Sequence, residues 1–424
     1  MNLLSKERLV RGHRIAWWLC IVSLPWLDMA NNQCLILLLL LWIIEGDFLL
    51  KWQKIKAATW TYPFLVYYLL LVIGMIYTRD VDNGLFTLDK KVTFLGLPIV
   101  VATGLKLDEK FIGFLKRSFV YSCCVVILIC AVWASYYYAR GGDGLNFDIY
   151  TNENFKTFHP DASPVWMHFS YIQLAHWAGL HPAYLSMYLT FCLAILFTER
   201  YTGNRERAIH FLLGLFLAIA IALLSTRMAI IAFICTAVYL SIKKILEGET
   251  KSVVLIAAVS FVLLFLLWLN PVTRFRVIEE PKITAYHADQ NVTRWNSVSY
   301  RLLEWQGSWA SIKSNWFAGV GTGGTKLAME DFYAHYNSST VGLEHNAHNQ
   351  FLQVWMESGI LGLMAFLLSL YAGLFRLGKN PAYVSFILIF SLMCLTESIG
   401  ERQKGVVFFT LFQVLFLGFV KREE

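Results

Sequence analysis

Charged residues are scarce in this sequence of 424 residues: only 15% are Asp, Glu, Lys or Arg, whereas 57% are hydrophobic. The mean hydropathy is positive, at +0.53, and soluble domains typically carry about 25% charged residues. This deficit excludes a water-soluble enzyme and indicates a polytopic membrane protein. The net charge of +7 does not imply a nucleic-acid partner, because basic residues in the short loops of a membrane protein set its orientation.

Cysteine is missing from the two longest polar segments. All eight cysteines fall inside apolar runs, at Cys20, Cys34, Cys123, Cys124, Cys130, Cys192, Cys235 and Cys394. A secreted framework of disulfides or a cysteine-ligated zinc site needs cysteines in the loops. Their placement argues against both.

Apolar runs recur along the whole chain. At roughly 20 residues per span, they predict an all-α membrane protein with about twelve transmembrane helices. The expected helices cover residues 12–29, 33–50, 60–77, 91–105, 112–138, 182–199, 208–224, 227–242, 252–270, 350–371, 382–398 and 405–420. The first run follows basic residues, as in a signal peptide, but it lacks a cleavage site and is expected to stay as an anchor. No repeat or linker divides the chain, which favours one membrane domain over residues 1–424.

The loops differ in charge and length. With the N-terminus in the cytoplasm, every inner loop is basic, as the positive-inside rule requires, and both termini lie inside. The outer side then receives a large loop, residues 271–349, and a smaller one, residues 139–181. Within the smaller loop, residues 165–180 are rich in Trp, His and Tyr, which suits a helix in the membrane interface; a belt of aromatic residues at that depth is the alternative, and we favour the belt.

Arg227 interrupts an apolar run and has no acidic residue near it in sequence. An arginine at a helix end can extend its charged group to the interface. Alternatively it forms an anion site, because a guanidinium binds phosphate oxygens with two parallel hydrogen bonds and stays charged. Both interpretations remain open from the sequence.

Arg301 opens a segment in which apolar residues recur at helical spacing, so we expect it on an amphipathic helix of the large loop. A surface ion pair with Glu304 or Glu344 is one interpretation, and substrate binding is the other. The glycines that follow, from Gly319 to Gly324, match G-x-G-x-x-G, but the preceding strand that a dinucleotide site needs is missing. They predict a tight turn whose backbone amides approach a phosphate.

His345, His348 and Asn349 directly precede the apolar helix expected at 350–371. Two histidines three residues apart can hold a metal, but no HExxH motif and no clear third ligand accompany them. A neutral imidazole is also the usual general base near neutral pH, and a structural hydrogen bond is the third alternative. We favour the base, and His348 over His345 because it lies nearer the apolar helix.

The order of these features resembles the O-antigen ligase and polymerase superfamily of bacterial envelope enzymes. The resemblance covers about residues 208–370 and rests on the Ser-Thr-Arg turn at Arg227, Arg301-Leu302, the segment 316–321, and His348-Asn349-Gln350 followed by Glu357-Ser358-Gly359. Upstream, the segment Leu88–Lys91 with Leu97-Pro98 and the segment His181–Tyr184 are also similar to this superfamily.

The resemblance implies a fold related to the C-type membrane glycosyltransferases. It also implies transfer of a glycan from undecaprenyl diphosphate to an acceptor hydroxyl, such as that of lipid A–core, on the periplasmic side of the inner membrane. By position, Arg227 and Arg301 correspond to arginines that hold the donor diphosphate, and His348 to the base. We expect the remaining substrate contacts from His345, Asn349, Lys90 and Lys91.

Such a donor brings its own leaving group, so an inverting transfer needs no metal, nucleotide or other cofactor, only stabilised charge and a base. Asp80 and Asp82 could form the carboxylate pair of a metal-dependent transferase, but a polar turn explains them equally, and we favour the turn. A polymerase of the same superfamily is the main alternative to a ligase. A lipid-linked glycan transporter fits less well, because transporters place polar residues at mid-membrane.

Overall fold

The computed structural model describes residues 6–26, 28–141, 153–199, 203–282, 297–335 and 346–419, and every regular element within these ranges is a helix. The N-terminal half contains α1 (Lys6–Ser23), α2 (Asp28–Ile44), α3 (Phe48–Ala57), η1 (Thr59–Thr61), α4 (Tyr62–Gly74), α5 (Val81–Lys91), α6 (Thr93–Thr103), α7 (Glu109–Ala139), α9 (Glu153–Phe158), α10 (Pro164–His168), α11 (Tyr171–Ala175), η2 (His176–Ala178) and α12 (Pro182–Thr198). The C-terminal half contains α13 (Asn204–Leu224), α14 (Arg227–Leu246), α15 (Thr250–Leu269), α16 (Pro271–Arg274), the π-helix η3 (Phe275–Glu279), α17 (Glu280–Lys282), α18 (Ser297–Asn315), α19 (Thr325–His335), α20 (Gln350–Tyr371), α21 (Leu374–Leu377), α22 (Pro381–Cys394), η4 (Ile399–Glu401) and α23 (Gln403–Phe419).

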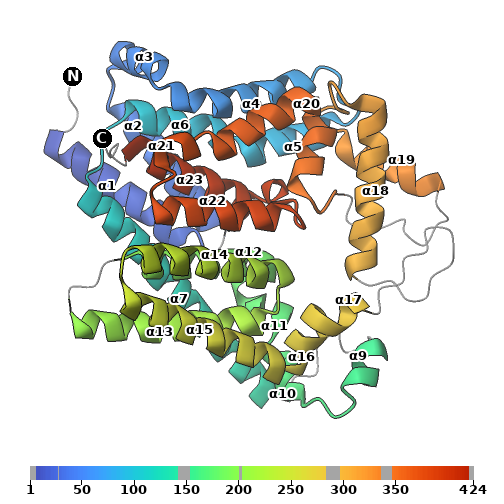
Figure 1. Cartoon of the computed structure of the whole chain (residues 1–424). Coiled ribbons are helices and arrows are strands. Elements are labelled where there is room, and N and C mark those ends of the chain that lie inside the picture. The colour runs from blue at the N-terminus through green and yellow to red at the C-terminus, as the bar shows by residue number, and fades with distance from the viewer. Residues whose placement is uncertain are drawn as a thin grey trace.

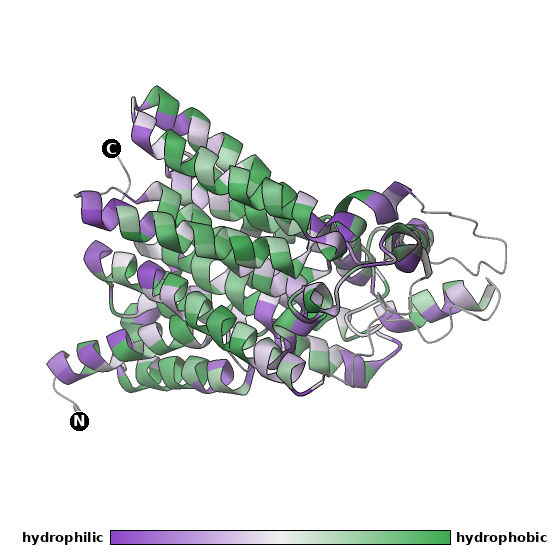
Figure 2. Ribbon diagram, turned by 90° about the horizontal axis from the view of Figure 1, so that it is seen from below, coloured by the Kyte–Doolittle hydropathy of each residue, from purple (hydrophilic) through white to green (hydrophobic). Residues whose placement is uncertain are grey.

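The long helices form a bundle with two different ends (Figure 1). α1 begins and α23 ends at one end, whereas α18 lies crosswise over the opposite end, with α16, α17 and α19 beside it. Figure 2 shows hydrophobic residues along the middle of the helices and hydrophilic residues at both ends of the bundle. This pattern is typical of a membrane protein.

Among the described residues, five helical segments are long and apolar enough to cross a membrane: α7, α13, α14, α15 and the segment Gln350–Leu377. Two bent pairs raise the number to seven if each is one span: α2 with α3, bent by 112°, and α11–η2 with α12, bent by 83°. Three further apolar helices, Thr59–Gly74, Pro381–Cys394 and Gln403–Gly418, are shorter. The all-helical membrane class is therefore confirmed, while the expected twelve spans stay a prediction, because these helices fall short of the ~20 residues per span.

The centre of the bundle is α12, whose side chains are buried from Pro182 to Phe197. Phenylalanines of α22 and α23 pack around it; for example, the ring centroids of Phe191 and Phe412 are 4.9 Å apart. Between helices in lipid, packing of this kind replaces the hydrophobic effect as the main source of stability. This packing supports the end of the bundle that α18 covers.

α20 is broken at Gly359, whose φ of 66° and ψ of −170° are not helical. The glycine turn after α18 fills the break: the Val320 and Gly321 amides donate to the carbonyls of Met356 and Glu357, at 2.8 and 3.1 Å. A Cβ on Gly319 would lie 2.6 Å from the Glu357 carbonyl oxygen. The expected tight turn is confirmed, but these two amides bind the broken helix, so the glycines serve packing.

Two further expectations can be compared with the structure. Asp80 is the N-cap of α5, since its carboxylate accepts the Asn83 amide at 3.0 Å, and Asp82 lies in the first turn of that helix; the polar turn expected there is a helix N-terminus. The single interface helix considered for 165–180 is wrong: the chain forms α10, α11 and η2. The break before α11 falls at Tyr171, whose φ of 51° is incompatible with a continuing helix.

Candidate active site

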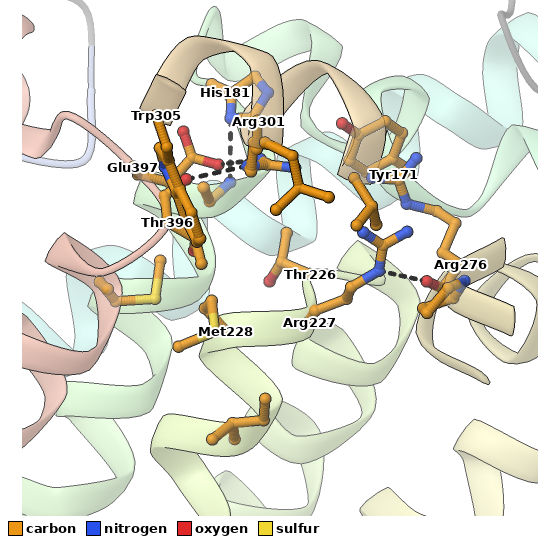
Figure 3. Close-up of a pocket in the computed structure, with 16 residues that line it drawn as sticks. Tyr171, His181, Thr226, Arg227, Met228, Arg276, Arg301, Trp305, Thr396 and Glu397 are labelled. Carbon is orange, nitrogen blue, oxygen red and sulfur yellow. Dashed lines mark hydrogen bonds and ion pairs between the residues drawn. The ribbon is translucent and has the colours of Figure 1, made fainter. Parts of the chain in front are cut away.

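A cavity of about 310 Å³ lies at the end of the bundle covered by α18 (Figure 3). It is lined from six parts of the chain: Tyr171, His181, Ala183, Thr226, Arg227, Met228, Ile231, Arg276, Pro281, Val298, Arg301, Leu302, Trp305, Met393, Thr396 and Glu397. Figure 3 shows Arg301 and Glu397 on one side and Arg227 with Arg276 on the other. Three guanidinium groups therefore face one small space.

Arg227 is the first residue of α14, directly after a turn in which Ser225 has a φ of 53°. The turn is held from outside: the Ser225 hydroxyl lies 2.8 Å from the Thr273 hydroxyl of α16. The guanidinium donates to the Arg276 carbonyl and forms an ion pair with Glu280. Glu280, which is 53 residues away in sequence, compensates the charge of an arginine that begins an apolar helix.

Arg276 lies on the π-helix η3, and π-helices are common at functional sites. Its guanidinium carbon is 3.4 Å from the centroid of the Tyr171 ring, and its Nε donates to the Ser225 carbonyl at 3.3 Å. η3 is fixed by an apolar cluster in which Phe155 and Met167 of the smaller loop pack on Val272 and Phe275. Described residues of the two long loops therefore pack together beside the cavity.

Arg301 lies on α18, as its periodicity predicted. Its Nε donates to the Thr396 carbonyl at 3.0 Å, and its terminal nitrogen forms an ion pair of 2.6 Å with Glu397. The sequence had suggested Glu304 or Glu344 as partners; Glu344 lies outside the described residues. A carboxylate that the sequence did not indicate, Glu397 in the loop after α22, pairs with the guanidinium.

His348 contacts the same carboxylate. Its Nδ1 lies 3.3 Å from one Glu397 oxygen, and its Nε2 lies 3.8 Å from a Glu304 oxygen. Burial lowers the pKa of His348, but contact with Glu397 and the charges of Glu304 and Glu397 outweigh it, and the net effect raises the pKa above its ordinary value. Burial likewise raises the pKa of Glu397, yet His348 and Arg301 lower it to about 2. Glu397 is therefore an anion at any working pH.

Glu397 thus joins the arginine side of the cavity to the histidine. A carboxylate on one imidazole nitrogen fixes the orientation of the ring and strengthens it as a proton acceptor. The arginines stabilise negative charge on a phosphate group, and neutral His348 can take a proton from a hydroxyl. This is the chemistry of group transfer from a phosphorylated donor to an alcohol.

The other expected contact residues lie elsewhere. The Asn349 carboxamide oxygen caps α20 by accepting the Phe351 and Leu352 amides, and its nitrogen donates to the Leu395 carbonyl at 3.0 Å. His345 lies outside the described residues. Neither Asn349 nor His348 lines the cavity directly.

Lys90 and Lys91 do not line the cavity either. Lys91 has only 1% of its side chain exposed and forms ion pairs with Glu357 at 2.7 Å and Glu401 at 2.8 Å. Lys90 lies 3.5 Å from Glu401. Because Glu401 follows Glu397 on the same short segment, the lysines hold the segment that carries the site carboxylate.

Sequence reasoning missed Glu397, Arg276, Tyr171 and the role of His181 as a cavity residue. The only local signals are a polar Thr-Glu-Ser at the end of an apolar run and a second arginine in Arg274-Phe275-Arg276. Across the described ranges, no group of three or more His, Cys, Asp or Glu residues could hold a metal ion.

Residues 212–367 match the family model described as O-antigen ligase. This segment contains Arg227, Arg276, Arg301 and His348, and the match supports the resemblance to the O-antigen ligase superfamily found in the sequence. Tyr171, His181 and Glu397, which complete the cavity, lie outside the matched residues. No curated protein matches the chain.

Proposed function

We propose that the protein is a glycosyltransferase that moves a glycan from undecaprenyl diphosphate to an acceptor hydroxyl, and that the acceptor is lipid A–core. The observation that carries this proposal is that three arginines and Glu397 line one cavity, and that Glu397 also contacts His348 beside it. A diphosphate leaving group needs positive charge at the bond that breaks, and a sugar hydroxyl needs a base.

In this mechanism the donor diphosphate lies between Arg227 and Arg301. His348, oriented by Glu397, removes the proton of the acceptor hydroxyl as the oxygen attacks the anomeric carbon. The bond from that carbon to the diphosphate oxygen breaks in the same step, so the anomeric centre inverts. Undecaprenyl diphosphate leaves, and neither metal nor nucleotide takes part.

The orientation we propose places the cavity on the periplasmic side of a bacterial inner membrane and both termini in the cytoplasm. It is supported by the position of α18 at the end of the bundle opposite the start of α1 and the end of α23 (Figure 1). The basic residues of the short loops favour the same orientation. Labelling of single cysteines from outside intact spheroplasts tests it.

Deletion in the native host followed by glycolipid analysis tests ligase against polymerase. Loss of the ligase leaves free core together with accumulated lipid-linked polymer, which is the result we expect. Core capped by a single repeat unit would show a polymerase, and unaltered glycolipids would overturn both. Complementation with His348→Ala controls for loss of the protein itself.

A further inference from the structure

We propose that Arg276 binds the diphosphate of the donor and supplies the guanidinium nitrogens that are available when the donor enters the cavity. The inference rests on the proposed function, and it adds a residue that the sequence motifs did not indicate. It follows from how each of the three cavity arginines is bound in the structure.

Arg227 and Arg301 each have a carboxylate partner. Glu280 pairs with Arg227, and Glu397 pairs with Arg301 at 2.6 Å. Arg276 differs: within the described ranges no carboxylate lies within 4.0 Å of its side-chain nitrogens, and the one hydrogen bond that its guanidinium makes there is from Nε to the Ser225 carbonyl. Its positive charge is thus the one that a phosphate would neutralise.

The position of Arg276 is set before any ligand arrives. Its guanidinium lies on the Tyr171 ring, 3.4 Å from the centroid, and stacking uses the face of the group. The N–H bonds lie in the plane of the guanidinium, so stacking leaves the terminal nitrogens able to donate to oxygens. A pre-positioned arginine loses less side-chain entropy on binding than a free one.

The neighbours of Arg276 suit a diphosphate. Its carbonyl accepts a hydrogen bond from the Nε of Arg227, so the Arg227 guanidinium lies beside the Arg276 backbone. Thr226 also lines the cavity, is 7% exposed, and its hydroxyl oxygen has no hydrogen-bond partner in the described part of the chain. A buried hydroxyl without a partner is unfavourable, and a phosphate oxygen would supply one.

Binding of undecaprenyl diphosphate, with undecaprenol as the probe without phosphates, tests the inference on the purified full-length protein. Charge-assisted hydrogen bonds contribute ~1.5–3 kcal/mol, so Arg276→Gln should weaken binding of undecaprenyl diphosphate about 10- to 100-fold. The affinity of Arg276→Lys for undecaprenyl diphosphate should lie between those of the wild type and Arg276→Gln. Tyr171→Leu should weaken binding less than Arg276→Gln, and Tyr171→Phe, which keeps the ring, should bind as the wild type does.

Arg274→Gln is the matched control. Arg274 lies two residues away, but it pairs with Glu279 at 2.9 Å and does not line the cavity, so its loss should leave binding unchanged. Wild-type affinity in folded Arg276→Gln, judged by thermal unfolding, would overturn the inference alone. Equal binding of undecaprenyl diphosphate and undecaprenol by the wild type would overturn the proposed function, and the inference with it.

Discussion

Two groups of ionic side chains lie near the polar end of the bundle, and they differ in access to solvent. In the sealed group, the side chains of Lys91 and Glu357 are each 1% exposed and that of Glu401 15%. In the open group, 24% of Arg301, 24% of His348 and 12% of Glu397 is exposed. Both groups contain cations paired with carboxylates, but only the open group contributes residues to the lining of the candidate active site.

The difference distinguishes ion pairs that stabilise the fold from ion pairs that can take part in catalysis. In the sealed group Lys91 and Glu357 are buried against each other, so removal of one leaves an unpaired buried charge. In the open group the same kind of pair leaves faces of the charged groups accessible to a substrate. Substitutions in the sealed group should therefore change stability, and those in the open group should change turnover, binding or pH dependence.

The largest effect is expected for His348→Ala, which removes the general base. Turnover should fall by about 10²–10⁴ with donor binding largely intact, and His345→Ala should be much milder. Purified, equally folded variants are compared by glycan transfer between pH 5.5 and 8.5. If His345→Ala is the inactive variant, the base is assigned to the wrong histidine; if neither matters, the open group is not catalytic.

Lys91→Met should lower stability, because Glu357 then lacks its cation. Breaking a buried ion pair costs about 3–5 kcal/mol, so the thermal unfolding temperature in detergent should fall by several degrees at a fixed scan rate. Lys90→Met, whose pair with Glu401 is longer, serves as the control and should change little. An unchanged unfolding temperature with weakened substrate binding would instead support the expected contact of Lys91 with substrate.

Arg227→Lys and Arg301→Lys should each lose most activity, although both keep the charge. A lysine ammonium cannot form two parallel hydrogen bonds to a phosphate or carboxylate, and the loss of one charge-assisted bond corresponds to about 10- to 100-fold. The measurement is kcat/KM of the purified variants for the lipid-linked donor. Wild-type transfer by either variant would remove that arginine from the site.

Glu397→Gln should change the pH dependence as well as the rate. The base is active when neutral, and its raised pKa places the rising limb of kcat/KM above the ordinary value of ~6.5 in the wild type. Without the carboxylate, burial dominates and lowers the pKa of His348, so the limb should move to lower pH. If the rising limb of kcat/KM stays at the same pH in Glu397→Gln, Glu397 does not raise the pKa of His348.

The smallest effect is expected from chelation: activity should survive EDTA and need no added nucleotide. Loss of activity that Mg²⁺ or Mn²⁺ restores would contradict this expectation. It would direct attention back to Asp80 and Asp82, whose carboxylates are the hard oxygen ligands that these ions prefer.

The sequence predicted what depends on local patterns. Apolar runs gave the helical membrane class, the periodicity around Arg301 gave α18, and the motif order gave the superfamily. Arg227, Arg301 and His348 were expected together from resemblance, and the structure brings the first two to one cavity and links His348 to it through Glu397.

The rest depends on contacts between distant segments. Glu280 and Glu397 lie 53 and 96 residues from the arginines that they bind, and no sequence pattern encodes such pairs. The break at Gly359 is visible only when the glycine turn docks into it. Helices α4, α22 and α23 are as apolar as a membrane span but are shorter than one. A count of apolar runs therefore does not establish how many helices span the membrane.

The central claim is tested most directly by glycan transfer with purified wild-type protein, a defined undecaprenyl-diphosphate glycan and lipid A–core in liposomes. The account predicts one undecaprenyl diphosphate released for each glycan joined to core, with inverted anomeric configuration, and no transfer above background by His348→Ala. Equal transfer by His348→Ala, or movement of intact donor across the bilayer without any product, would contradict it.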